Sequence, residues 1–187
     1  MFSCGLLTID TRVGNIHVEG WDEPRLEIEA EKVVCAKSEE AAKSLYERLQ
    51  IQLEGADKRV VLRTLYPSRR FWRPFRGESK LSVNYRIRMP FDASLSLRCV
   101  DGDVTIHGVV GAQEVRVNYG SVEITVPELH RLHSLSARSF LGYVQSDLHG
   151  EESAGFIRTL SFWNPQGDQD ISVRVRMGGV YVYRGQD

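Results

Sequence analysis

The 187-residue sequence has few cysteines and no long apolar run. The three cysteines, Cys4, Cys35 and Cys99, are odd in number and widely spaced, which fits neither a disulfide framework nor a zinc site. We therefore expect free thiols, at least one of them buried. No apolar run approaches the roughly 18 residues that indicate a membrane span, and the first residues lack the basic and apolar regions of a signal peptide. Phosphate-binding loops, dinucleotide motifs and nucleophile elbows are also missing.

A strong net charge is missing too. The formal net charge is −1, which argues against nucleic-acid binding by the chain as a whole. The apolar fraction of 42% and the charged fraction of 26% are ordinary for a globular protein. The basic residues are unevenly placed, because residues 67–90 carry seven of them against one acid and every basic residue after position 90 is arginine.

What the sequence does contain is a repeated phrase, a glycine followed by alternating β-branched residues. The lead glycines are Gly14, Gly102, Gly120, Gly142 and Gly178. The last four start 18, 22 and 36 residues apart, so the step is about 20 residues, with one copy either masked or missing. A period in this range is typical of stacked repeats, in which each unit buries its apolar side on the next.

Alignment on the lead glycine assigns an inside and an outside to each repeat. Mostly apolar residues stand seven, five and three positions before the glycine and two and four positions after it, as in Leu95, Leu97, Cys99, Val104 and Ile106. Alternation of period two sends these residues to one face. Each repeat is therefore predicted to be a strand, a glycine bend and a second strand, with glycine where a Cβ would crowd the corner.

The remaining segments predict one helix and several more strands. Ser38 is a suitable N-cap for a helix at about 38–50, strands are expected near 50–54 and 59–66, and a strand over 81–89 ends at Pro90. We predict a mainly β fold with a glycine-led stack over 91–187, of the β-solenoid or β-helix type. An N-terminal β-lobe over 1–90 would contain the helix and the first repeat, within one continuous domain. A β-sandwich with hairpins is the alternative.

The order of these motifs resembles a known family. Gly14-Asn-Ile-His-Val-Glu-Gly20, the helical Ser38-Glu-Glu-Ala-Ala segment, Tyr85-Arg-Ile-Arg-Met-Pro90 and Gly102-Asp-Val-Thr-Ile-His-Gly108 are similar to the DUF4097 family of bacterial adhesin-like domains. The resemblance implies a stack of β-strands, often in proteins of the cell envelope, with no catalytic residues or cofactor to carry over. A cytoplasmic location is the alternative, because the sequence has no recognisable signal peptide or anchor.

An arginine stands four residues before each later lead glycine. These are Arg98, Arg116, Arg138 and Arg174, whereas the first copy has Asp10. If neighbouring strands lie about 4.8 Å apart, the guanidinium groups form a column of like charges, which disfavour one another. Either interleaved acids such as Asp103, Glu114 and Glu123 neutralise the column, or it binds an anionic polymer such as an acidic polysaccharide.

A second candidate surface is the loop over 67–77, which two prolines and a glycine keep out of regular structure. It combines arginine with aromatic residues: Arg69, Arg70, Phe71, Trp72, Arg73, Phe75 and Arg76. Such a loop could cap the exposed strand edges at the end of the stack or dock a partner. Binding of nucleic acid through this loop is the least favoured interpretation.

Signals for catalysis are weak. His130 and His133 have metal-like spacing but no third ligand, Asp101 and Asp103 are not repeated in the other copies, and Cys99 points inward. We predict no catalytic site, no metal site and no cofactor. The favoured function is a non-enzymatic adhesin-like binding or scaffold module for a protein or an acidic polysaccharide. A self-assembling structural protein is the alternative, and a carbohydrate-active enzyme is less favoured.

Overall fold

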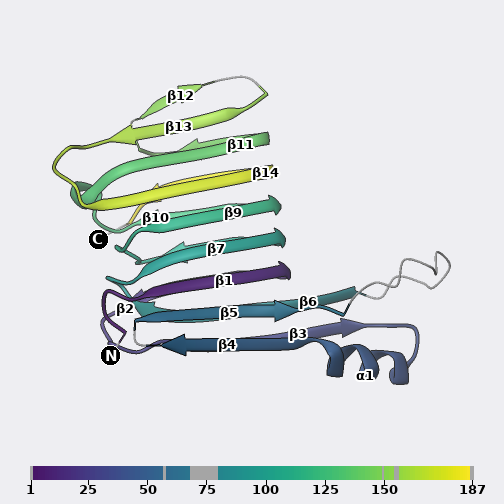
Figure 1. The fold of residues 1–187 in the computed structure, drawn as a ribbon. Helices are drawn as coiled ribbons and strands as arrows, with labels where there is room; N and C mark the ends of the chain where they lie inside the picture. Colours follow the sequence, from purple (N-terminus) through teal and green to yellow (C-terminus); the bar gives the residue numbers. More distant parts are fainter. Residues whose placement is uncertain (1, 57, 68–79, 149, 154–155, 186–187) are drawn as a thin grey trace.

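The computed structural model describes residues 2–56, 58–67, 80–148, 150–153 and 156–185. They form a mainly β structure with one α-helix, which confirms the predicted fold class. Fourteen strands join in one curled, mixed sheet, stacked one above another in Figure 1. No helix among the described residues is long and apolar enough to cross a membrane.

The repeats build two layers of strands. The first layer contains β1 (Leu6–Val13), β7 (Ser94–Asp101) and β9 (Gln113–Tyr119), and the second contains β2 (Ile16–Trp21), β8 (Val104–His107) and β10 (Val122–Val126). The long strands β11 (Leu132–Ser146) and β14 (Gln169–Arg184) each run through the corner and contribute to both layers. Inward side chains from the two layers meet in one hydrophobic cluster.

Parallel pairing in a single register joins the repeats, which the hairpins of a β-sandwich would not give. Ile9 lies opposite Leu97, and Leu97 lies opposite Val115. The corner glycines stack as well: Gly102 and Gly120 have φ angles of 151° and 127°, and a Cβ on either would overlap the carbonyl oxygen of the neighbouring corner glycine. The predicted need for glycine at the corner is therefore confirmed.

The predicted inside positions are buried. In all five copies the residues seven, five and three positions before the glycine are buried, and so are those two and four positions after it in four copies. The exceptions, Val144 and Ser146, are half-buried in the second part of β11. That part pairs only with β14 among the described residues, so no further repeat covers it.

The order of the copies in space differs from their order in the sequence. The last copy, β14, lies between β9 and β11. The described residues between Gly142 and Gly178 contain no further copy of the repeat. That interval contains β12 (Glu151–Ser153) and β13 (Arg158–Trp163), which pair antiparallel with each other. Because β13 also pairs with one edge of β11, the last copy pairs with the other edge.

Antiparallel strands also close the N-terminal end of the stack. This end contains β3 (Glu27–Cys35), α1 (Glu39–Arg48), β4 (Gln50–Ala56), β5 (Arg59–Leu65) and β6 (Lys80–Pro90). The strands β5 and β6 continue the parallel stack beside β1 and β2, whereas β4 and β3 pair antiparallel with them. The antiparallel ends make the sheet mixed, so a uniform β-solenoid stays a prediction.

The helix begins where the sequence predicted. The Ser38 side-chain oxygen accepts a hydrogen bond of 3.2 Å from the Ala41 backbone N–H, which confirms the N-cap. None of the helical residues is buried, but Leu49, directly after α1, is fully buried. A short 3-10 helix, η1 (Leu129–Arg131), precedes β11.

Candidate functional site: the arginine ladder

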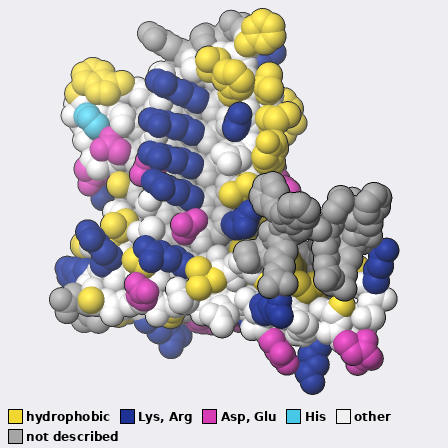
Figure 2. Space-filling view, turned by 45° about the vertical axis from the view of Figure 1, so that its right-hand side comes forward, with side chains coloured by type: hydrophobic (Ala, Val, Ile, Leu, Met, Phe, Trp, Pro, Cys, Tyr) yellow, Lys and Arg dark blue, Asp and Glu magenta, His cyan; other side chains and the backbone are white. Residues whose placement is uncertain are grey.

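The strand register places the four predicted arginines side by side on the outer face of the first layer. Arg98 lies opposite Arg116, Arg116 opposite Arg174, and Arg174 opposite Arg138. Figure 2 shows basic side chains stacked on one face of the molecule. At a strand spacing of about 4.8 Å the four positions span about 14 Å. We call these four residues the arginine ladder.

Most of the positive charge of the ladder is not neutralised locally. Arg116 forms an ion pair with Glu114, while its buried Nε has no hydrogen-bond partner among the described residues. Within the described part of the chain, Arg98, Arg138 and Arg174 make no ion pair, and all three are exposed. Neighbouring like charges on a sheet are unfavourable, so the ladder does not stabilise the fold.

Of the three acids that were expected to neutralise the column, only Glu114 does so. The Asp103 carboxylate instead accepts hydrogen bonds from the Ser121 backbone N–H, at 2.8 Å, and from its hydroxyl, at 2.6 Å. Glu123 belongs to β10 in the second layer. The expectation was wrong for Asp103 and Glu123 because both follow the corner glycine, which carries the chain to the other layer.

Two further rows of side chains flank the ladder on the same face. The row two residues before it is rich in hydroxyl groups: Thr8, Ser96, Glu114, Ser172 and Ser136 lie in register. The row two residues after it is mixed: Arg12, Val100, Asn118, Arg176 and Phe140. A shallow depression of about 420 Å³ opens beside the ladder, with Asn118, Phe140 and Arg176 in its lining.

The structure adds three arginines to this face that the sequence analysis missed. Arg12 and Arg176 stand two residues after Asp10 and Arg174, so the period-two alternation already placed them outward. Arg63 lies opposite Asp10 on β5, which places a further arginine one strand beyond the first repeat. No lead glycine follows Arg63, and the glycine alignment therefore could not detect it.

The outer face of the second layer has a different character. Here a trough runs over β6 between β3 and β2, with Glu27, Glu29, Arg86 and Arg88 in its lining and a volume of about 650 Å³. The charges are partly paired, because Arg88 lies 3.2 Å from a carboxylate oxygen of Glu19. We call this surface the acidic face.

A second hollow of about 570 Å³ continues the trough along the acidic face. Asn84 donates a hydrogen bond of 3.2 Å to Glu31 there. The rings of His17 and His107 approach to 5.6 Å between their centroids, and the His107 Nδ1 lies 2.8 Å from the Thr125 hydroxyl. The two hollows thus present carboxylate, guanidinium, amide and imidazole groups, with acids in the majority.

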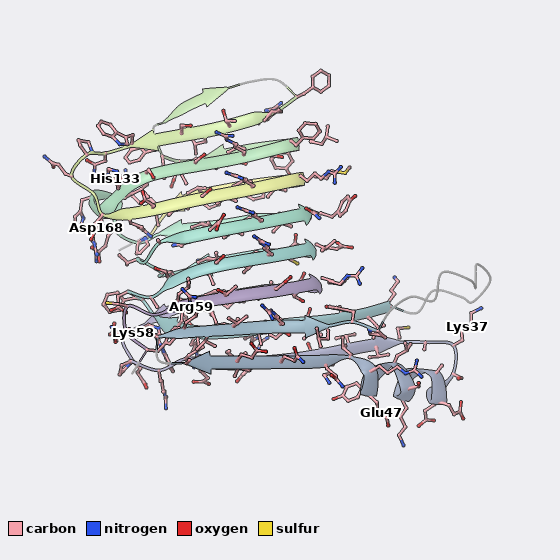
Figure 3. The ribbon with its side chains drawn as sticks, in the orientation of Figure 1. Lys37, Glu47, Lys58, Arg59, His133 and Asp168 are labelled. Atoms are coloured by element: carbon pink, nitrogen blue, oxygen red, sulfur yellow. The ribbon has the colours of Figure 1, made fainter. Side chains whose placement is uncertain are left out.

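The histidines considered for metal binding have other partners. His130 lies 3.6 Å from Glu128, and the His133 Nδ1 lies 2.9 Å from the Asn164 carbonyl oxygen. Figure 3 shows His133 and Asp168 at the same end of the first-layer strands. Arg131 donates two hydrogen bonds to Asp168, which lower the pKa of that carboxyl. Across the described residues, no three His, Cys, Asp or Glu side chains gather in a possible metal site.

The cysteines behave as the sequence predicted. Cys99 is buried, and burial raises the pKa of its thiol from 9.0 to about 11. Cys4 and Cys35 are exposed free thiols. Cys4 donates a hydrogen bond to Asp92, and this bond raises the pKa of Cys4. Cys99 is therefore an unreactive thiol in the core.

The second candidate surface, the loop with Arg69, Arg70, Phe71, Trp72, Arg73, Phe75 and Arg76, lies outside the described residues. Its predicted role in capping or partner docking stays a prediction.

Comparison with known proteins bears on the fold. No family model and no curated protein matches the chain, so the resemblance to DUF4097 is not confirmed. One solved structure, a candidate cell adhesion protein from Clostridium sporogenes, is similar over 98% of this chain and 94% of its own, with a TM-score of 0.52 and 11% sequence identity. At that identity the likeness shows a shared β-rich fold.

Proposed function

We propose that this chain is a non-enzymatic, adhesion-type binding module whose arginine ladder holds an extended anionic polymer. The observation that carries the proposal is the register of four arginines on adjacent strands, three of them without an acidic partner among the described residues. Such a row stays unfavourable until an external anion neutralises it. The shared fold with a candidate cell adhesion protein supports a binding role.

The chemistry of the face favours an acidic polysaccharide as the polymer. A planar guanidinium binds a carboxylate or sulfate through two parallel hydrogen bonds, and the row of Ser96, Ser136 and Ser172 offers hydroxyl groups to sugar hydroxyls alongside. Nucleic acid fits less well. A protein that binds single-stranded nucleic acid usually stacks the bases on several aromatic side chains. The three described rows contain one aromatic residue, Phe140.

The distribution of acids supports binding without turnover. Hydrolysis of a glycosidic bond usually needs two carboxyl groups placed across the bond. In the three described rows of this face the acids are Asp10 and Glu114, and Glu114 is already paired with Arg116. A polymer on the ladder would therefore meet cations and hydroxyl groups and no free pair of carboxyl groups.

Polygalacturonate binding to purified protein tests the proposal, with dextran as the uncharged control polymer. We expect Arg98→Ala combined with Arg116→Ala to weaken polymer binding at least about tenfold, because each substitution removes one guanidinium group that would bind the polymer. Lys43→Ala combined with Arg48→Ala removes the same charge from α1 and should leave binding within about twofold. Equal losses in the two double variants, or equal binding of dextran, would contradict a specific role for the ladder.

A further inference from the structure

The two outer faces of the molecule carry opposite charge, although the whole chain is nearly neutral. The ladder face presents eight arginines against four acids: Arg12, Arg59, Arg63, Arg98, Arg116, Arg138, Arg174 and Arg176 against Asp10, Glu54, Glu114 and Asp170. The acidic face presents six acids against three basic residues: Glu19, Glu27, Glu29, Glu31, Asp103 and Glu123 against Lys80, Arg86 and Arg88. Segregation of this kind gives the chain two mutually attractive surfaces.

The two faces also differ in relief. The ladder arginines project from the first layer, where Arg98, Arg138 and Arg174 are exposed. The acidic face is hollowed by the trough of about 650 Å³, whose lining includes Glu27 and Glu29. Neither of these two glutamates forms an ion pair within the described part of the chain. A row of projecting cations therefore has as its counterpart a hollow with two unpaired carboxylates, which lie beside Arg86 and the paired Arg88.

We propose that the arginine ladder of one copy docks into the acidic trough of a second copy. The contact uses two different patches, so it is heterologous: one copy keeps a free trough and the other keeps a free ladder. Assembly can therefore continue beyond a dimer. The arginines occupied in this way are those of the proposed polymer site, but the docking does not depend on polymer binding.

Salt and polyanions should both dissociate the assembly. Exposed charges attract over about 10 Å at 0.1 M salt and over about 3 Å at 1 M. In sedimentation velocity, we expect mass to increase with protein concentration at about 50 mM salt and the association to weaken at least about tenfold at about 500 mM. Polygalacturonate should dissociate the assembly by competing for the ladder. A chain that remains monomeric at low salt overturns the proposal.

Two complementary variants test which faces meet. The ladder variant carries Arg98→Gln, Arg138→Gln and Arg174→Gln, and the trough variant carries Glu27→Gln, Glu29→Gln and Glu31→Gln. Each variant lacks one of the two surfaces, so each should be monomeric alone. A mixture should form a one-to-one complex and stop there, because the ladder of the trough variant fits the trough of the ladder variant. Self-association of either variant, or no complex in the mixture, overturns the proposal.

Controls separate this inference from the proposed polymer binding. The trough variant keeps its ladder, so it should be monomeric yet bind polygalacturonate with unchanged affinity. Lys37→Gln, Lys43→Gln and Arg48→Gln remove three charges near α1 and should leave assembly intact. Polymer binding by a strictly monomeric wild type overturns the docking alone, whereas salt-sensitive assembly without polymer binding overturns the polymer site alone. Circular dichroism verifies folding, and the salt response of the wild type decides the question if a variant misfolds.

Discussion

The ladder face and the acidic face are built from the same stack of strands, yet they handle charge differently. On the acidic face Arg88 has two local partners, since it lies beside Glu19 and over the ring of Trp21. On the ladder face one residue type is repeated from strand to strand, and Arg116 alone has an acidic partner among the four. A repeated unpaired cation on neighbouring strands costs stability and indicates a binding role.

The corner glycines join the two layers of strands that carry these faces. Substitution of one of them should have the largest effect on the stability of the fold. Gly120→Ala forces a Cβ against the carbonyl oxygen of Gly102 at a φ of 127°. We expect it to lower the free energy of unfolding by roughly 3 kcal/mol or more, measured by urea denaturation. Gly55→Ala is the matched control, because its Cβ meets Val60 at an ordinary 3.6 Å. Similar losses in both variants would contradict the corner role.

The shared core behind both faces should respond to alkaline pH through Cys99. Its pKa is raised by burial from 9.0 to about 11, so folding favours the neutral thiol. The resulting stabilisation is complete below pH 9 and is lost as the pH rises through 11, a change of roughly 2 to 3 kcal/mol. Cys99→Ala should flatten the fall in stability over this window.

Some alkaline loss should survive that substitution, because burial also raises the pKa of Tyr85 above its usual 10.0. Urea denaturation between pH 8 and 11 measures both slopes. An unchanged slope in Cys99→Ala would show that the thiol does not titrate in this window.

The smallest expected effects have opposite signs on the two faces. Arg98→Gln removes repulsion within the ladder and should stabilise the fold by about 0.2–1 kcal/mol. Arg88→Gln removes the ion-pair partner of Glu19 and should destabilise the fold by a similar amount, about 0.2–1 kcal/mol. Thermal unfolding at low salt compares the stabilities of the two variants, and at high salt the difference between them should shrink. Destabilisation by both would mean that the ladder is neutralised within the fold.

The interior of the repeats was predictable from the sequence because it follows two simple rules. Alternation of period two decides which side chain is buried, and a fixed distance from the lead glycine decides the register. Leu97 and Val115, at the same distance from their glycines, therefore lie opposite each other. The same rule predicted that Arg98 and Arg116 would be neighbours on the outside.

The order of the copies was not predictable, because each bent strand specifies its own shape and register but not which neighbour it joins. Arg174 therefore lies between Arg116 and Arg138, out of sequence order. The antiparallel strand β13, which occupies one edge of β11, has no lead glycine to mark it. The partners of Asp103 also escaped prediction, since position relative to the corner decides the layer in which a charge lies.

The most direct test of the central claim is a titration that observes each arginine separately. The Nε–Hε resonances of the guanidinium groups can be followed by NMR while polygalacturonate is added to the labelled protein. In the trough variant, which is expected to be monomeric, the ladder predicts shifts at Arg98, Arg116, Arg138 and Arg174, with Arg86 and Arg88 unchanged on the acidic face. Polymer binding that shifts the acidic-face arginines and leaves the ladder resonances in place would contradict the claim.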